Sequence, residues 1–200
     1  MRIENPVRLG GLAALLAGVL LIISRLLGSL SYGFFPFKLS GGELAIYGFL
    51  GIDGYLGVLL VVLVQLGLIG LYAPQAKAAG ALGAAGLFIA FIGTRLAMFP
   101  SFVDPILIKS SEWPPGGGSE EFWWELALFG LTFVLGWVLF GIATLRAGVY
   151  PRSAAALLIA GALILLLPLP LSDVIFAVAM AWMGYVLFTG RGQQAAQPAL

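Results

Sequence analysis

Long apolar runs recur along this chain, and they limit its fold more than any other feature of the sequence. Four runs are long, at residues 9–30, 52–72, 78–99 and 122–145, and two shorter ones follow at 153–167 and 173–189. About 20 apolar residues form a helix that can cross a hydrocarbon core of about 30 Å. The runs therefore predict an all-α fold, a polytopic membrane bundle of six transmembrane helices.

The connections between the runs predict three helical hairpins within a single integral membrane domain. Two outer connections, at 31–51 and 100–121, contain sequences with the spacing of a capped helix start, such as Ser40-Gly-Gly-Glu43. Aromatic residues concentrate in the first of them, and aromatics prefer the membrane–water interface. We therefore expect short outer interfacial helices at 41–50 and 102–109, and a frayed tail at 191–200. A cleaved signal peptide is the alternative for the first run, but its apolar core would normally be 7–15 residues long.

Composition agrees with a membrane protein and excludes several kinds of site. Of the 200 residues, 61% are hydrophobic and 10% are charged, whereas a soluble domain carries about 25% charged residues. A net charge of +1 gives no basic stripe for nucleic acid. The chain has no cysteine and no histidine, which removes thiol chemistry and most transition-metal sites. We predict no metal, no cofactor and no catalytic residue.

The charges predict the topology. The positive-inside rule places Lys and Arg of short loops in the cytoplasm. Six spans with both termini cytoplasmic put six basic residues inside: Arg2, Arg8, Lys77, Arg146, Arg152 and Arg191. Eight acidic residues then lie on the outer side: Glu43, Asp53, Asp104, Glu112, Glu120, Glu121, Glu125 and Asp173.

One turn carries a resemblance. The segment from Gly136 through Leu145-Arg146-Ala-Gly148-Val-Tyr-Pro151-Arg152 to Gly161 places Gly148 at a helix end and Pro151 at a helix start. This hairpin, together with the run after Arg8, resembles small uncharacterised bacterial six-span proteins. The resemblance implies a setting in the bacterial inner membrane, and it implies no activity because none is assigned to those families.

Two short triplets place an arginine inside an apolar run: Ser24-Arg25-Leu26 and Thr94-Arg95-Leu96. An arginine at a helix centre in the membrane costs about 2.5–3.5 kcal/mol, and less near the interface. Three interpretations stay open for Arg25 and Arg95: extension of the side chain to the headgroups, an ion pair with Asp53, Glu125 or Asp173, or a place in a ligand cavity. Arg25 shares a helical face with small and polar residues, which is typical of helix–helix contact. Those residues include Gly18, Ser29 and Tyr32.

Other polar and small residues in the runs have plainer interpretations. Glu125 is the carboxylate expected to pair with an arginine, while Asp173 and Asp53 are expected mainly to cap helices. Gln65 predicts an interhelical hydrogen bond, typically worth about 0.6 kcal/mol. Gly10, Ala14 and Gly18 predict a packing face, as do Gly86 and Ala90, either within the fold or with another copy.

Three functions follow from these patterns. The first is an accessory or structural membrane protein that packs against lipid or a membrane-protein partner, homo-oligomerisation being left open. The alternative is a binder or transporter with an outward-facing pocket for a small anionic or amphipathic ligand, such as a lipid headgroup. The ligand-binding residues expected for it are Arg25, Arg95, Ser29, Tyr32, Thr94, Asp53 and Glu125. The third is a membrane-embedded enzyme dependent on a carboxylate, for which the sequence offers no pair of nucleophile and base.

Overall fold

A computed structural model describes residues 6–32, 54–97, 120–167 and 172–190, with side chains over 6–26, 57–96, 127–167 and 173–190. These residues form helices and turns, and no strand occurs among them, so the predicted all-α class is confirmed. The elements are α1 (Pro6–Tyr32), α3 (Gly54–Tyr72), the 3-10 turn η1 (Ala73–Gln75), α4 (Ala76–Ala97), α6 (Glu120–Ala147), α7 (Arg152–Ile164) and α8 (Ser172–Phe188). The expected interfacial helices at 41–50 and 102–109, and the tail at 191–200, lie outside the described residues.

Three stretches are long and apolar enough to cross a membrane. They are Pro6–Leu26, Gly57–Leu96 and Ala127–Ala147, and the second contains both α3 and α4. Two shorter apolar helices cover Arg152–Ile164 and Asp173–Phe188. The helices thus lie at the positions of the apolar runs, and the long ones have the length and composition of membrane spans.

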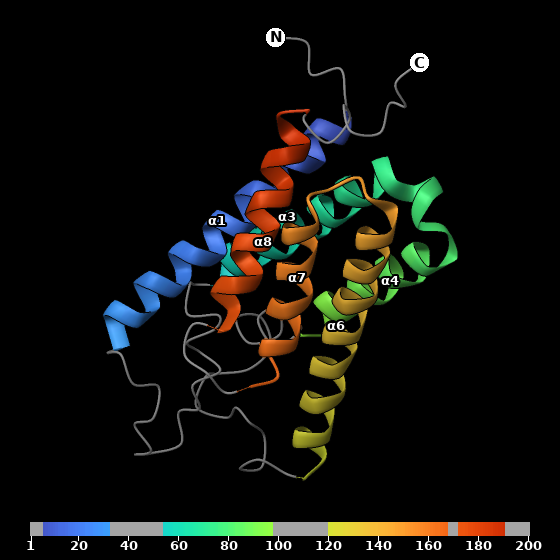
Figure 1. Cartoon of the computed structure of the whole chain (residues 1–200). Coiled ribbons are helices and arrows are strands. Elements are labelled where there is room, and N and C mark those ends of the chain that lie inside the picture. The colour runs from blue at the N-terminus through green and yellow to red at the C-terminus, as the bar shows by residue number, and fades with distance from the viewer. Residues whose placement is uncertain (1–5, 33–53, 98–119, 168–171, 191–200) are drawn as a thin grey trace, which may run out of the picture.

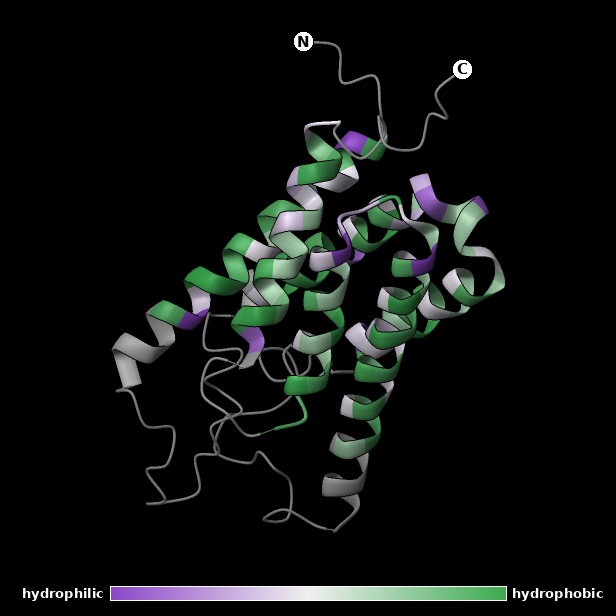
Figure 2. Ribbon diagram, viewed as in Figure 1, coloured by the Kyte–Doolittle hydropathy of each residue, from purple (hydrophilic) through white to green (hydrophobic). Residues whose placement is uncertain are grey.

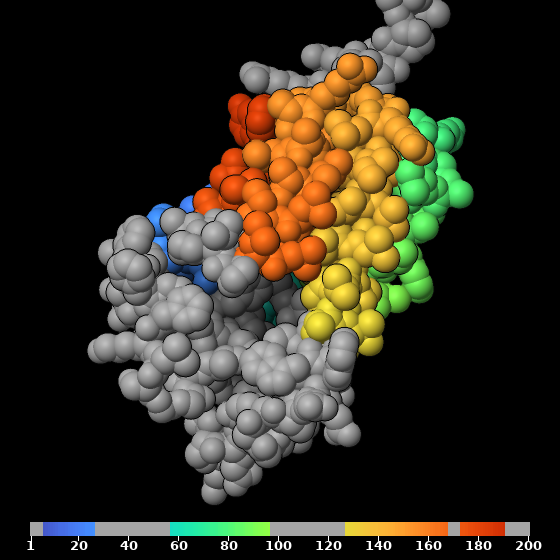
Figure 3. Space-filling model, turned by 60° about the horizontal axis from the view of Figure 1, so that its bottom comes forward, coloured from blue at the N-terminus to red at the C-terminus, as the bar shows by residue number. Residues whose placement is uncertain are grey.

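The helices form a ring of neighbours around one core. α1 packs between α3 and α8, α7 packs between α8 and α6, and α4 packs against α6 and meets α3 near η1. Figure 1 shows the start of α1, the end of α8, the α3–α4 turn and the α6–α7 turn at one end of the bundle. Figure 3 shows α7 alongside α6 across one face. Neighbours in the ring therefore run in opposite directions along the bundle.

Glycines let the helix backbones touch. A Cβ on Gly10 of α1 would lie 2.3 Å from the Cα of Gly70 on α3, and a Cβ on Gly136 of α6 would lie 2.2 Å from the backbone nitrogen of Ala90 on α4. A Cβ on Gly18 would meet the backbone of α8 at Ala177. The small-residue faces predicted from the sequence are thus confirmed as contacts within the fold, where close backbone approach increases van der Waals contact.

The ring is filled by large side chains. Trp137 of α6 is fully buried and meets Phe176 of α8 edge-on, with ring centroids 4.8 Å apart. Phe133 and Phe140 contact the same indole ring. Leu68 of α3 is also fully buried in this cluster, so side chains from several helices share one core.

Among the described residues, three glycines adopt a backbone conformation that other residues rarely reach: Gly80, Gly148 and Gly190. Gly148 has φ of 67°, and its N–H donates to the Thr144 carbonyl 3.2 Å away, which ends α6 as the sequence predicts. Gly80 has φ of 57° and ψ of −150° inside α4. The expected span at 78–99 has no such interruption, so the break at Gly80 is a finding of the structure.

The outer surface of the bundle is apolar along its length. Figure 2 shows hydrophobic residues over most of the helices and hydrophilic ones mainly toward the ends. Large apolar side chains on the outside include Leu16, Ile23, Leu66, Phe88, Leu131, Leu135 and Leu163. A soluble monomer rarely exposes apolar patches larger than a few hundred Å², so this surface fits a protein surrounded by lipid.

Candidate functional site

The first and last helices are joined by an ion pair. Nε of Arg25 on α1 donates to Oδ2 of Asp173 on α8. The Asp173 side chain is 5% exposed and that of Arg25 is 25% exposed. Of the three interpretations that the sequence leaves open for Arg25, the structure therefore shows the ion pair, with Asp173 as its partner.

The helix register explains why these two residues meet. α1 and α8 touch where Gly18 approaches Ala177 and Ala181. Because the helices are antiparallel, moving about two turns along α1 to Arg25 corresponds to moving back along α8 to its first turn. Asp173 lies in that first turn. The ion pair is thus a consequence of the small-residue contact that sets the register.

Asp173 is the ion-pair partner of Arg25, one of the three that the sequence left open, although a helix cap was the expected main role. A helix cap was expected, because a carboxylate in a first turn is favoured by the helix dipole. The structure instead buries it against Arg25. The available signal was the charge sorting, which places Asp173 at the same end of the bundle as Arg25.

The second oxygen of the Asp173 carboxylate takes no part in the ion pair. Oδ1 of Asp173 is buried and has no hydrogen-bond partner in the described part of the chain. A buried carboxylate oxygen normally accepts a hydrogen bond, from the protein or from ordered water. Ser24, which precedes Arg25 in the sequence, donates its hydroxyl to the Leu21 carbonyl in its own helix, at 2.8 Å. The pair therefore has capacity for one more donor at Oδ1.

The second triplet is used differently. Thr94 is fully buried, its Oγ1 donates to the Ala90 carbonyl at 2.7 Å, and the same oxygen accepts from Nε1 of Trp137 at 3.1 Å. Arg95 is exposed, on a face of α4 with Phe88, which is 67% exposed. Thr94 thus joins α4 to α6, while Arg95 lies on the outer side of that contact.

The remaining predicted site residues are only partly described. Ser29 and Tyr32 lie in the last turns of α1, and Glu125 lies near the start of α6, but the described side chains do not include theirs. Asp53 lies outside the described residues. The structure therefore brings Arg25 together with Asp173, and places Thr94 and Arg95 on a different helix pair.

A second polar cluster lies at the opposite end of the bundle. Nε2 of Gln75 donates to Oγ1 of Thr144 at 3.0 Å, and the Tyr150 hydroxyl donates to the Leu71 carbonyl at 2.9 Å. Burial raises the pKa of the Tyr150 phenol well above its usual value. The cluster joins the α3–α4 turn to the α6–α7 turn with neutral hydrogen bonds.

Two glutamine atoms lack partners. Oε1 of Gln75 and Nε2 of Gln65 are buried without a hydrogen bond to any described residue. The amide nitrogen of Gln65 therefore does not make the interhelical hydrogen bond predicted for this residue. Orphaned buried atoms of this kind are uncommon, since most find the protein or water as a partner.

Neither a metal site nor a known relative indicates a function, as far as the described residues and the comparisons go. No group of three or more His, Cys, Asp or Glu side chains that could hold a metal occurs among them. Comparisons with protein-family models, curated proteins and solved structures find no match to this chain. The geometry of the chain itself is thus the basis for assigning a function.

Proposed function

We propose that this chain is an accessory or structural membrane protein, a six-span bundle of three hairpins that packs against lipid or a membrane partner. The Arg25–Asp173 pair is the observation that carries the proposal. It neutralises an embedded cation inside the fold, by linking the first helix to the last. The polar groups of Thr94, Thr144 and Tyr150 likewise form hydrogen bonds between helices or between a helix and a turn.

The proposed setting is the bacterial inner membrane, with both termini cytoplasmic. Exposed cations support this orientation, because they lie at the starts of α1, α4 and α7 and the end of α6: Arg8, Lys77, Arg152 and Arg146. Figure 2 shows hydrophilic residues at that end of the bundle. Lys and Arg in short loops favour the cytoplasmic side.

Single cysteines test the orientation, because the natural chain has none. We expect Lys77→Cys to react with a membrane-impermeant thiol reagent only after cells are opened. Gly117→Cys, in the connection predicted to lie outside, should react in intact spheroplasts. The reverse pattern would overturn the orientation.

Native mass spectrometry tests the structural role. The purified protein should carry phospholipid alone, and the apolar pair replacement Arg25→Leu/Asp173→Leu should leave its bound species unchanged. A retained small molecule that is not a lipid, and that this double variant loses, would contradict a purely structural pair.

A ligand pocket at the same pair is the second candidate. The orphaned Oδ1 of Asp173 and the quarter-exposed Arg25 favour it, since a ligand could donate to the first and pair with the second. The ligand would be a small amphipathic molecule or lipid headgroup on the outer side. Arg95, Glu125 and Asp53 stay proposed as further contacts.

Water access distinguishes the two candidates. If a pocket opens outward, Ser24→Cys should react with a small polar thiol reagent added outside, and the fully buried Thr94→Cys should not. Protection of both cysteines would overturn the pocket and leave the structural role.

A further inference from the structure

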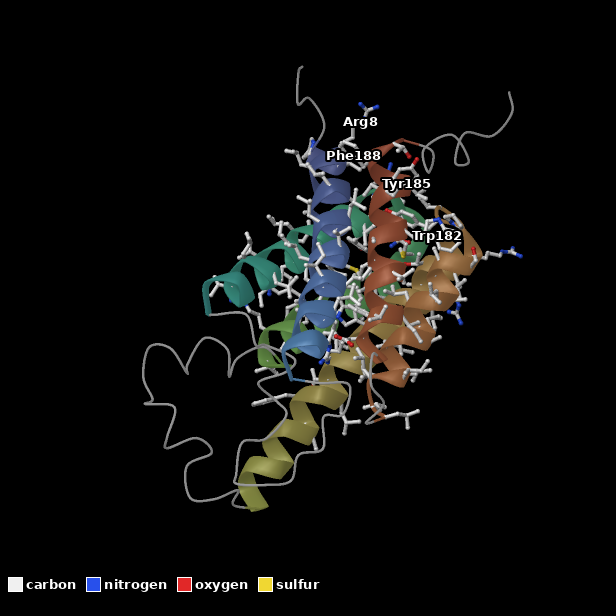
Figure 4. The ribbon with its side chains drawn as sticks, turned by 90° about the vertical axis from the view of Figure 1, so that its left-hand side faces the viewer. Arg8, Trp182, Tyr185 and Phe188 are labelled. Atoms are coloured by element: carbon white, nitrogen blue, oxygen red, sulfur yellow. The ribbon has the colours of Figure 1, made fainter. Side chains whose placement is uncertain are left out.

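α8 presents an aromatic face to the outside of the bundle. Trp182, Tyr185 and Phe188 follow one another at three-residue spacing. They are 41%, 44% and 43% exposed, although Met183 and Leu187 between them are buried against the core. Figure 4 shows the three side chains following α8 downward from its end. The aromatic face therefore descends about 9 Å from the last turn of the helix.

A cation stands at the upper edge of this face. Nη2 of Arg8, on the first turn of α1, lies 3.7 Å from the position that a Cβ on Gly190 would occupy. The Arg8 side chain is exposed and lies beyond Phe188 in Figure 4. The carboxyl end of a helix favours a cation, which helps to hold the guanidinium beside α8. With its five N–H donors, the guanidinium has the capacity to bind an anionic partner.

The order of these groups matches the order of groups in a phospholipid. A guanidinium suits a phosphate, and below it Phe188, Tyr185 and Trp182 provide aromatic surface for the start of an acyl chain, within the interfacial zone where Trp and Tyr are enriched. The same end of the bundle exposes Lys77, Arg146 and Arg152. The described acidic residues, Glu120, Glu121, Glu125 and Asp173, lie at the starts of α6 and α8, at the opposite end.

We propose that Arg8 and the aromatic face of α8 (Trp182, Tyr185 and Phe188) bind one anionic phospholipid. The phosphate pairs with Arg8, and an acyl chain lies along Tyr185 and Trp182. The site deepens the proposed function and rests on it, because the lipid belongs to the membrane in which the bundle is proposed to lie. A positive end of the protein selects an anionic headgroup over a zwitterionic one through charge complementarity.

Native mass spectrometry with defined lipids tests the site. Detergent-solubilised protein is titrated with phosphatidylglycerol, and separately with phosphatidylcholine. We expect the wild type to retain one phosphatidylglycerol with about tenfold higher affinity than Arg8→Gln, and several-fold higher than Trp182→Ala. Arg152→Gln is the matched control, because Arg152 is exposed at the same end but belongs to α7, and it should bind as the wild type does.

Each other result has a defined meaning. If Arg8→Gln and Arg152→Gln lose the same affinity for phosphatidylglycerol, the lipid is held by general electrostatic attraction and the proposed site is wrong. Retention of phosphatidylcholine as strong as that of phosphatidylglycerol would likewise overturn the site. Displacement of the lipid by millimolar inorganic phosphate would show an anion site rather than a lipid site. Reconstitution into liposomes is measured on the same samples. A wild type that inserts without selecting lipid refutes only the site, whereas one that fails to insert refutes the proposed function.

Discussion

The two arginine triplets are nearly identical in sequence, yet the bundle uses them in opposite ways. In the first, Arg25 turns toward α8 and pairs with Asp173, while the Ser24 hydroxyl donates to a carbonyl of its own helix. In the second, Thr94 is buried against α6 and Arg95 is exposed. Adjacent helical residues differ by about 100° around the axis. A rotation of the helix by the angle between two adjacent residues therefore decides whether the arginine or the hydroxyl faces a neighbouring helix.

The difference shows what an embedded polar group contributes. The ion pair joins two helices through charge, and removing Arg25 would leave the buried Asp173 carboxylate without the cation that it binds. The Thr94–Trp137 hydrogen bond joins two helices without charge. Loss of this bond leaves a neutral N–H donor without an acceptor, which costs less free energy than an unpaired buried charge. The two contacts should therefore respond differently to substitution.

The largest effect is expected at the ion pair. Asp173→Leu should lower the free energy of unfolding by about 3 kcal/mol, because Arg25 would keep its charge in a partly buried place. Arg25→Leu should also lower the free energy of unfolding, because it leaves the Asp173 carboxylate buried without its cation. The double Leu variant should be more stable than either single variant. Denaturant unfolding in mixed micelles measures this. Strictly additive losses would contradict a coupled pair.

Close packing between α4 and α6 ranks next. Gly136→Ala should destabilise the protein by about 2 kcal/mol, since the new methyl group overlaps the Ala90 backbone and forces the helices apart. Gly130→Ala on the same helix meets nothing within 4 Å and serves as the control. Similar melting temperatures for the two variants would show that the contact is looser than described.

The hydrogen bond of the second triplet should matter less. Thr94→Val keeps the shape of the side chain but leaves Nε1 of Trp137 without its acceptor, at a cost of about 0.6–1.7 kcal/mol. Ser24→Ala in the first triplet should cost less, because Ser24 bonds within its own helix. Thermal unfolding of both variants makes the comparison. A larger loss at Ser24 would reverse the assigned roles of the two hydroxyls.

Arg95 should give the smallest effect. Its side chain is exposed, and charge contacts at an exposed position contribute about 0–1 kcal/mol. Arg95→Leu should therefore unfold almost as the wild type does, in contrast to Arg25→Leu. If the two variants lose equal stability, then the triplets are equivalent and the comparison fails.

The sequence alone determined the features that depend on local pattern. The helix positions follow from the apolar runs, and the turn at Gly148 and Pro151 follows from their backbone preferences. The packing faces of Gly10, Gly18 and Gly86 could also be read, because small residues at four-residue spacing form a stripe on one side of a helix.

Which side chains meet across the helices depends on the packing of the bundle. Spacing along one helix does not show which face turns toward which neighbour, so the sequence favoured Glu125 over Asp173 as the partner of an arginine, and it did not separate the roles of the two triplets. Those outcomes depend on the register between α1 and α8, and between α4 and α6, set where glycines touch the facing helix. The break at Gly80 was also beyond local pattern, because a glycine in an apolar run is compatible with either a continuous or a broken helix.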